Sequence, residues 1–598
     1  MTERTPEDFP MPDPTEFSQN LVRIAAQSQK LVTEFLERQK DAQDGPVDPL
    51  HVGDAFMEMT AKMMSDPAKV VQAQIDLWQN YMQLWQNTAQ RMLGQDVAPL
   101  VTEDRSDRRF KDKSWSENQI FNFIKESYLL TSKWLTETVR GVEGLDPKTA
   151  KKVDFYTRQF VDALSPSNFI MTNPMVLRET LATNGENLVN GLDHMLEDLE
   201  RGKGKLAIKM TDFDAFQVGG NVATTPGKVV FRNDLIELLQ YNPTTEQVFE
   251  RPLLITPPWI NKFYILDLRP ENSFIKWATE QGLTVFCISW VNPDQKLAQK
   301  TFEDYMFEGI LAALDAVEQA TGQREVTAIG YCLGGTLMAS TLAYMAEKGD
   351  DRIKACTFFT AQVDFTEPGE LGVFIDDEQL AHIEQLMSER GYLDGADMAT
   401  TFNMLRANDL IWTFVVNNYL MGKDPFPFDL LYWNADATRM PAKMHTFYLR
   451  QMYQRNLLME PGGITLGGVP IDLRKVSIPV YLQAGKEDHI APYKSVFKAT
   501  KIFSGPTRFM LAGSGHIAGV VNPPEPVKYQ HWINTKRKKY DTPDDWLAEA
   551  EEHKGSWWPD WIKWMAKQSG KKVPARVPGE GKLPAICDAP GEYVKVRS

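Results

Sequence analysis

One stretch restricts the fold more than any other: EVTAIGYCLGGTLMAS, Glu325–Ser340. Its apolar run predicts a buried strand that passes through Gly330, Cys332 and Gly334 into a helix. Glycines suit the two flanking positions because side chains there would meet neighbouring backbone. A strand, a sharp turn and a helix in this order typically present a nucleophile, which is usually serine. Cys332 takes that place here, and the alternative is a buried structural cysteine.

The predicted turn would also activate the thiol. Cys332 would lie at the N-terminus of a helix, and the helix dipole favours the thiolate over the thiol. The next backbone N–H, that of Leu333, would point at an oxyanion developing on a bound acyl group. We therefore predict nucleophilic catalysis by Cys332.

A cysteine nucleophile needs a base and a group that orients the base. In the α/β-hydrolase fold these follow the nucleophile in the order acid, then histidine. The loop GKEDHIAP, Gly485–Pro492, follows a predicted strand and offers Asp488, with Glu487 as the weaker alternative. The loop GSGHIAG, Gly513–Gly519, follows the next strand and offers His516 as general base. His489 is the competing histidine, because it adjoins Asp488.

The second oxyanion donor is expected in the loop TPPWINK, Thr256–Lys262. The two prolines have no N–H, so we predict the backbone N–H of Ile260, with Asn261 as the second choice. The alternative is that this loop is only a rigid turn. Lys262 and Arg269 are either cations of a binding pocket or ordinary surface charges.

The pattern around these motifs predicts the fold class. Short apolar runs bounded by turn residues alternate with amphipathic stretches such as Phe302–Ala320, which indicates a mostly parallel, buried sheet. About 120 residues separate two of the runs, and we interpret residues of about 361–450 as a cap over the active-site edge. Its expected helices are Asp377–Arg390 and Leu410–Leu420. The predicted strands are Gly227–Phe231, Leu235–Tyr241, Leu253–Thr256, Leu283–Ser289, Val326–Tyr331, Ile353–Thr360, Val480–Gln483 and Arg508–Leu511.

The chain before this sheet is expected to be helical. We predict a helical N-terminal domain over residues 1–205 and a catalytic α/β domain over 206–598, with a loosely ordered C-terminal tail from about 571. Further N-terminal helices are expected at about 116–141 and 147–163. One predicted helix is capped by Asp66, Pro67 and Gly94 and carries the stripe Val71, Ile75, Trp78, Met82, Trp85, Ala89, Met92. The stripe either packs within its own domain or contacts a dimer partner, another partner or a hydrophobic surface.

Composition excludes several classes of protein. The 598 residues carry a formal net charge of -15, which argues against nucleic acid as the main partner. The four cysteines are widely spaced, so neither a disulfide scaffold nor structural zinc is expected. No stretch resembles a secretory signal or reaches the ~20 apolar residues of a membrane span. These features indicate a cytoplasmic protein with reduced thiols and no bound metal.

With these motifs assembled, the chain resembles the class I polyhydroxyalkanoate synthases. The resemblance runs along most of the chain, and its central box G-x-C-x-G-G stands at Gly330–Gly335. Other matching segments are RSDRRFKDKSW, SPSNF, TPGKVVFRN, PPWINKFYILDLRPENS, ISWVNPD, FDLLYWNADAT, GKEDHIAP, GSGHIAGVVNPP and GSWWPDW.

The resemblance implies an activity and a set of partners. Such enzymes polymerise (R)-3-hydroxyacyl-CoA, here with (R)-3-hydroxybutyryl-CoA as the expected monomer, and release CoA. By matching motifs, Cys332 would hold the growing chain as a thioester. His516 would be the base, and Asp488 would orient His516 or help to activate the 3-hydroxyl. The family further implies a homodimer on the surface of polyester granules and no cofactor beyond the CoA of the substrate.

Two other functions share parts of this pattern. A cysteine-dependent thioesterase or polyester depolymerase would use the same three residues but would release free hydroxy acid. A non-catalytic granule-surface or scaffold protein would keep the fold, but it would be expected to lack one of the three.

Overall fold

The computed structural model describes residues 9–41, 52–536 and 538–597. The chain divides into two compact units: residues 1–212 with 402–426, and residues 213–401 with 427–598. The first boundary lies a few residues beyond the predicted position near 205. The second unit holds the sheet and the cysteine turn.

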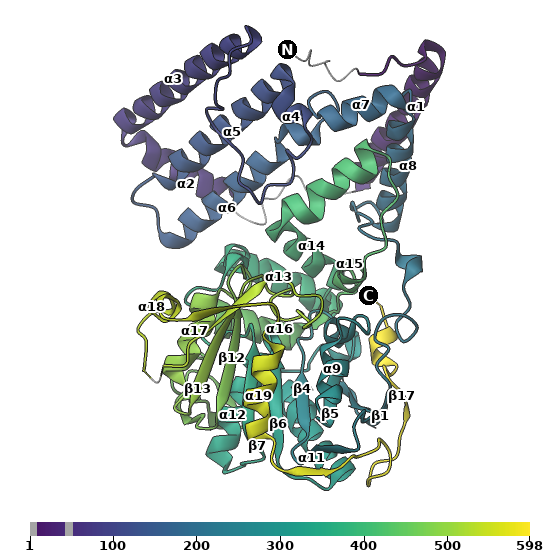
Figure 1. The fold of residues 1–598 in the computed structure, drawn as a ribbon, viewed down its shortest axis with the longest axis vertical. Coiled ribbons are helices and arrows are strands. Elements are labelled where there is room, and N and C mark those ends of the chain that lie inside the picture. Colours follow the sequence, from purple (N-terminus) through teal and green to yellow (C-terminus); the bar gives the residue numbers. More distant parts are fainter. Residues whose placement is uncertain (1–8, 42–51, 537, 598) are drawn as a thin grey trace. The chain divides into compact units, whose positions relative to one another are not determined.

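The second unit is built on an eleven-stranded sheet (Figure 1). Six neighbouring strands, from β13 to β5, are parallel, and the outer pairs at both ends are antiparallel. The predicted α/β-hydrolase fold with a mostly parallel sheet is thereby confirmed. The strand order is β15 (Glu551–Lys554), β14 (Gln530–Ile533), β13 (Thr507–Ala512), β12 (Val480–Gly485), β7 (Ile353–Phe359), β6 (Val326–Tyr331), β4 (Leu253–Thr256), β5 (Val285–Trp290), β2 (Ile236–Tyr241), β1 (Gly227–Arg232) and β17 (Cys587–Asp588).

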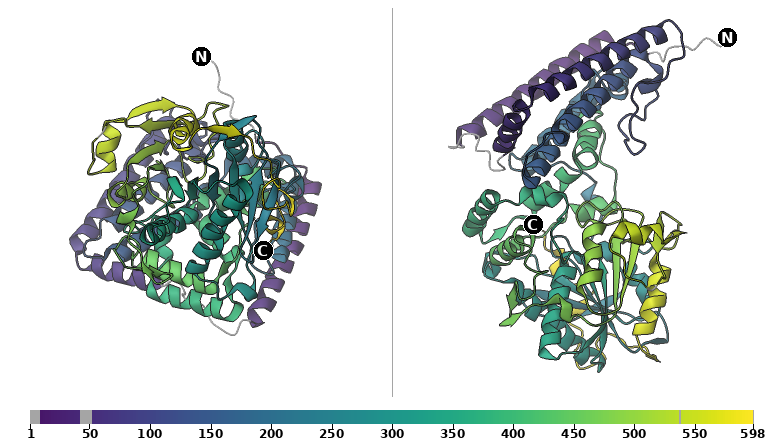
Figure 2. Two further views of the ribbon diagram at one scale, coloured as in Figure 1. Left: turned by 90° about the horizontal axis from the view of Figure 1, so that it is seen from below. Right: turned by 90° about the vertical axis from the view of Figure 1, so that its left-hand side faces the viewer.

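Alternate residues of the central strands pack into two separate hydrophobic cores, one on each face of the sheet. In β5, Phe286 and Ile288 pack on one face while Val285 and Cys287 pack on the other. This is the two-residue period of a strand buried on both faces, and it explains why these strands read as continuous apolar runs. Figure 2 (right) shows helices on both sides of the sheet.

Each face of the sheet has its own helices. One face is covered by α10 (Phe302–Asp304), the π-helical η5 (Tyr305–Leu311), α11 (Ala312–Thr321) and α12 (Leu333–Lys348). The other is covered by α9 (Phe274–Glu280) and the tryptophan-rich α19 (Trp558–Gln568). The helix predicted at Phe302–Ala320 is therefore present, with a π-helical middle. Helices α17 (Tyr493–Ile502) and α18 (Pro543–Ala548) also belong to this unit.

The C-terminal segment is part of the fold, so the expectation of a loosely ordered tail is wrong. Strand β17 pairs with β1 at the edge of the sheet, and Val594 in η11 (Tyr593–Lys595) is 1% exposed. Strand β16 (Lys572–Pro574) pairs with β3 (Gln247–Phe249). The prolines and glycines that suggested disorder instead form the turns between these short elements.

The region expected to form the cap is divided between the two units. Its elements in the second unit are η6 (Glu370–Phe374), α13 (Asp377–Arg390), α15 (Asp429–Asn434), α16 (Ala442–Tyr448) and the antiparallel pair β8 (Tyr392–Leu393) and β9 (Met440–Pro441). Beyond the expected bounds follow the π-helical η9 (Leu449–Gln454) and the hairpin of β10 (Thr465–Leu466) and β11 (Val469–Pro470). Residues 402–426 belong to the first unit, and the boundary falls within α14 (Gly395–Leu405). The helix expected at Leu410–Leu420 consists of two π-helical stretches, η7 (Asn408–Trp412) and η8 (Val415–Leu420).

The first unit is helical, as expected. Its helices are α1 (Pro14–Asp41), α2 (Val52–Met64), α3 (Pro67–Met92), α4 (Ser114–Glu117), α5 (Gln119–Arg140), α6 (Pro147–Ala163), α7 (Pro174–Ala182) and α8 (Glu186–Arg201), with η1 (Pro166–Asn168). The single helix expected at about 116–141 is interrupted at Asn118. The side chain of Asn118 accepts from the N–H groups of Ile120 and Phe121 and so starts α5 afresh.

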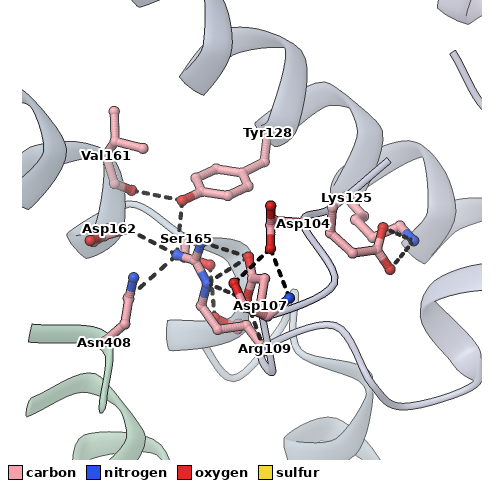
Figure 3. A network of polar contacts seen from close by, with 12 residues as sticks. Asp104, Asp107, Arg109, Lys125, Tyr128, Val161, Asp162, Ser165 and Asn408 are labelled. Carbon is pink, nitrogen blue, oxygen red and sulfur yellow. Dashed lines mark hydrogen bonds and ion pairs between the residues drawn. The ribbon is translucent and has the colours of Figure 1, made fainter. Parts of the chain in front are cut away.

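Residues 402–426 are held in the first unit by specific contacts (Figure 3). The Arg109 guanidinium donates to Asp162 (3.1 Å), Tyr128 (3.0 Å) and Asn408 (3.4 Å). The segment also lies directly against α8, since a Cβ on Gly191 would lie 1.8 Å from the carbonyl oxygen of Tyr419. Only glycine permits so close an approach, so the segment is an integral part of this unit.

The apolar stripe of α3 faces outward. Asp66 caps the helix by accepting from the N–H of Lys69, as predicted. The face that packs on α5 is a different one and includes Leu84 and Thr88. The exposed fractions of Trp78 and Trp85 are 64% and 60%. Packing within the unit therefore does not explain most of the stripe, although the Trp85 ring lies 5.1 Å from that of Phe123.

Candidate active site

The predicted turn places Cys332 between β6 and α12. Its backbone has φ 51° and ψ -120°, a strained conformation for a residue with a side chain. The N–H of Cys332 donates to the carbonyl oxygen of Phe359 on the adjacent strand (2.9 Å), which fixes the turn to the sheet. The thiol is thus held at the N-terminus of α12, as the sequence predicted.

Glycine is required where the turn passes the neighbouring strand. A Cβ on Gly334 would lie 2.2 Å from the carbonyl oxygen of Thr256 and 2.6 Å from that of Pro257. Both atoms belong to the backbone at the end of β4, so no side chain can move aside. The start of α12 and the loop after β4 therefore lie in direct contact, which is the arrangement a two-donor oxyanion hole requires.

Asp488 and His516 come together at the carboxyl ends of β12 and β13. The Nδ1 atom of His516 lies 2.7 Å from Oδ2 of Asp488. The other carboxylate oxygen, Oδ1, accepts from the N–H groups of Ile490 and Ala491, each at 2.9 Å. Asp488 is therefore fully engaged and fixed in orientation. Glu487 is exposed, and His516 rather than His489 contacts Asp488.

The Cys332 thiol lies near enough to His516 for its charge to act on the imidazole. Because Nδ1 is engaged by Asp488, Nε2 is the ring nitrogen left to serve as the base. Burial lowers the pKa of His516, but the negative charges of Asp488 and Cys332 outweigh this and raise the pKa well above its usual value. The structure thus brings the thiol, the imidazole and the carboxylate together, which is the arrangement that nucleophilic catalysis by a cysteine requires.

The other cysteines lie in different surroundings. Cys287 and Cys356 are buried in β5 and β7, and burial raises the pKa of both thiols well above the usual value. Cys587 lies in β17 at the edge of the sheet. Of these thiols, Cys332 is the one with a base beside it.

Three tyrosines near the thiol were missed by the sequence analysis. The Tyr331 hydroxyl donates to the backbone carbonyl of His516 (3.2 Å) and so steadies the histidine loop. Tyr448 in α16 is buried and Tyr453 in η9 is partly buried; burial raises the pKa of both hydroxyls, and the charge of the nearby Cys332 adds to the effect. The centroids of their rings lie 5.4 Å apart. The aromatic content of the predicted cap was the only signal for them in the sequence.

The loop after β4 is held by residues from the region expected to form the cap. The carbonyl oxygen of Ile260 accepts from the N–H of Thr438 (2.8 Å). The amide of Asn261 donates to the carbonyl oxygen of Asn434 (3.3 Å). Among the described residues, the N–H groups of Ile260 and Leu333 have no hydrogen-bond acceptor, so both are available to an oxyanion.

The two candidate pocket cations have different partners. Lys262 is buried, and its Nζ lies 2.6 Å from Oδ1 of Asp436. Arg269 is partly exposed and pairs with Asp429 (3.0 Å). Neither is an unpaired surface charge. A pocket of about 680 Å³ lies beside Asp436 and is lined by residues such as Tyr432, Glu592 and Arg597, but by none of Cys332, Asp488 and His516.

The described residues contain no group of three or more histidine, cysteine or acidic side chains arranged to hold a metal ion. Within the same ranges, no helix is both long enough and apolar enough to cross a membrane.

Comparison with known proteins places the chain in a family. The model for the poly-beta-hydroxybutyrate polymerase (PhaC) N-terminus matches residues 106–278, and the α/β-hydrolase fold model matches residues 268–523. A poly(3-hydroxyalkanoate) polymerase of Methylorubrum extorquens is 54% identical over 90% of this chain and 88% of its own length. The polymerase subunits PhaC of Rhizobium meliloti and Cupriavidus necator are 49% and 42% identical, over 99% and 89% of this chain and 97% and 90% of their own.

The chain therefore belongs to the poly(3-hydroxyalkanoate) polymerase family, as its motifs suggested. It is an acyltransferase-type enzyme built on the α/β-hydrolase fold.

Proposed function

We propose that this enzyme polymerises (R)-3-hydroxyacyl-CoA, with (R)-3-hydroxybutyryl-CoA as its monomer, through a thioester on Cys332. The observation that carries the proposal is the Asp488–His516 hydrogen bond beside Cys332, at a strained turn in a member of this family. No cofactor is needed, because the substrate brings its own activating thiol.

The first half of the cycle is acyl transfer from CoA to the enzyme. The Cys332 sulfur attacks the thioester carbonyl, and the negative charge on the carbonyl oxygen is met by the N–H groups of Leu333 and Ile260. The C–S bond to CoA then breaks, and His516 gives the departing sulfur the proton that it holds from Cys332. Sulfur replaces sulfur, so the exchange is nearly balanced in energy.

The second half forms the ester bond of the polymer. His516 takes the proton of a 3-hydroxyl, and the oxygen attacks the acyl group on Cys332. The C–S bond breaks, the ester forms, and the thiol is regenerated with that proton. Asp488 has one oxygen on His516 and the other on two backbone N–H groups, which supports an orienting role over direct activation of the hydroxyl.

A polymerase must keep water from the acyl-enzyme. Tyr448 and Tyr453 lie near the thiol, and the ring of Phe365 lies 4.9 Å from that of Tyr453. A dry aromatic enclosure favours attack by a bound hydroxyl over attack by water. This is the feature that separates the proposal from a thioesterase or depolymerase with the same three residues.

The test is a product assay with (R)-3-hydroxybutyryl-CoA. We expect CoA release matched by insoluble polyester, with Cys332→Ala inactive and Cys332→Ser severely impaired, because serine is far harder to deprotonate. Cys587→Ala is the matched control and should retain full activity. Free 3-hydroxybutyrate without polymer would instead establish a hydrolase, and activity in Cys332→Ala would refute the nucleophile.

We further propose that the enzyme works as a homodimer in the cytoplasm and on the surface of its polyester product, with the outward face of α3 as the contact to that surface. No charged residue lies between Asp76 and Arg91, while Trp78, Met82 and Trp85 are exposed. A stripe without charge matches an uncharged ester surface better than anionic lipid.

Sedimentation with polyester particles tests the surface contact. The double variant Trp78→Gln/Trp85→Gln should sediment less, while its activity in solution is unchanged. Met171→Gln, which alters an equally exposed residue of the same unit, is the control. Loss of the dimer in the double variant would show that the stripe is instead the contact between two copies.

A further inference from the structure

A buried ion pair stands beside the loop that would complete the oxyanion hole. Nζ of Lys262 and Oδ1 of Asp436 are 2.6 Å apart, and the two side chains are 3% and 2% exposed. The second oxygen of Asp436 accepts from the Tyr264 hydroxyl (2.9 Å). Burial lowers the pKa of Lys262, and the charge of Asp436 opposes this. Burying both charges is costly, and the mechanism above uses neither.

The pair is one of several contacts that join the same two segments. One segment is the loop Trp259–Lys262, and the other is residues 433–438, here called the clamp. The Trp433 indole donates to the carbonyl oxygen of Lys262 (2.8 Å). The N–H of Thr438 donates to the carbonyl oxygen of Ile260 (2.8 Å), and its hydroxyl donates to the carbonyl oxygen of Trp259, with that of Ile260 a more distant second acceptor (3.1 Å).

These contacts fix the loop at its carbonyl oxygens and at the side chain of Lys262. The carbonyl of Trp259 shares a peptide plane with the N–H of Ile260, and the carbonyl of Ile260 lies in the next plane, so Thr438 restricts the rotation of both planes. The N–H of Ile260 then has a fixed direction and, among the described residues, no acceptor. The neighbouring turn is equally fixed, because Gly334 lies directly against the backbone of Thr256 and Pro257.

We propose that Asp436 is a positioning residue for acyl transfer: by pairing with Lys262 it locks the loop to the clamp and aims the N–H of Ile260 at the acyl group on Cys332. It does not touch the substrate and acts only through the loop. The inference rests on the proposed function, since it takes the thioester on Cys332 as the group that carries the oxyanion.

Two reactions of the same thiol separate this role from general damage. Acyl transfer passes through an oxyanion, whereas alkylation of Cys332 by iodoacetamide displaces iodide and forms none. Asp436→Asn keeps the shape of the side chain but removes its charge. We expect kcat for CoA release to fall at least about tenfold, a fraction of the loss on removing a whole donor. KM and the alkylation rate should stay within about twofold of wild type, because neither requires the oxyanion donor.

A control and a second variant complete the design. Glu308→Gln removes the carboxylate of another ion pair of the same unit, Lys300–Glu308 (2.6 Å), and should change neither rate. Thr438→Val keeps the volume but removes the hydroxyl that donates to the loop, and should lower kcat about threefold with alkylation unchanged. If Asp436→Asn does not fold, Thr438→Val is the variant that tests the positioning role.

The outcomes are distinct. A kcat within twofold of wild type in Asp436→Asn, or a fall in alkylation as large as the fall in kcat, would overturn the positioning role. For a misfolded Asp436→Asn the same criteria apply to Thr438→Val. Activity in Cys332→Ala would instead overturn the proposed function, so the two failures cannot be confused.

Discussion

Adding one methyl group at Gly334 should disable the enzyme while leaving its catalytic side chains in place. In Gly334→Ala, the new Cβ would lie 2.2 Å from the carbonyl oxygen of Thr256 and 2.6 Å from that of Pro257, whereas ordinary contact begins at 3.4 Å. The two segments must therefore separate by about 1 Å. Neither can yield by rotating a side chain, because both contacts are backbone atoms.

The magnitude follows from what this displacement separates. The start of α12 carries Cys332 and the N–H of Leu333, while the loop after β4 carries the N–H of Ile260. A misplacement of 1 Å in an active site costs about 10²-fold in rate. Overpacking of this kind also destabilises a fold by about 1–3 kcal/mol. We therefore expect a soluble protein with kcat reduced about 100-fold.

The assay is CoA release from (R)-3-hydroxybutyryl-CoA, compared with Gly349→Ala. Gly349 ends the same helix at φ +69°, and a Cβ there would meet no atom within 4 Å. That variant should lose about 1 kcal/mol of stability through its left-handed backbone and keep its kcat. A kcat within threefold of wild type for Gly334→Ala would refute the reasoning that the close approach of helix and loop sets the active geometry.

Three further outcomes are expected. Asp488→Asn should lower the pKa of His516, because burial then meets less opposition from negative charge; a histidine NMR titration that moves upward would contradict this. Tyr453→Phe should lower kcat about tenfold in the CoA-release assay, because it removes a polar hydroxyl near Cys332; an unchanged kcat would exclude a role for that hydroxyl. Burial lowers the pKa of His445 to about 4, so stability present above pH 6.5 is lost as the pH falls toward 4, by up to about 3 kcal/mol. In His445→Gln the melting temperature should fall less between pH 7 and pH 5 than in wild type, and an equal fall would disprove the link.

Local chemistry made the core of the site predictable from the sequence. The turn at Cys332 has a signature of its own, since two glycines, a strand and a helix must coincide. Asp488 and His516 follow strands, and the carboxyl ends of parallel strands meet at one edge of a sheet. The proximity of such residues can be predicted from the order of the strands alone, without knowing how any side chain packs.

Residues that act through packing between distant segments were not predictable. Lys262 and Asp436 are 174 positions apart in the sequence. The residues around each of them give no signal that identifies the other as its partner. Tyr448 and Tyr453 appeared only as part of an aromatic-rich region. The stripe of α3 illustrates the same limit: the helical period identified an apolar face correctly, but packing on α5 uses Leu84 and Thr88 instead. Which face is covered depends on the partner helix.

The assignment of residues 402–426 to the first unit has a practical consequence for anyone who wishes to dissect this chain. A cut between residues 212 and 213 looks like a clean removal of an N-terminal region, yet it would leave this segment behind without the helices it packs on. Val416, Tyr419 and Met421, now at most 8% exposed, would be bared to water on the shortened enzyme. The truncated enzyme would expose a new apolar surface that promotes aggregation. Its aggregation or loss of activity would therefore be poor evidence that the N-terminal region takes part in catalysis. A fair dissection would also shorten this insertion or replace its apolar residues.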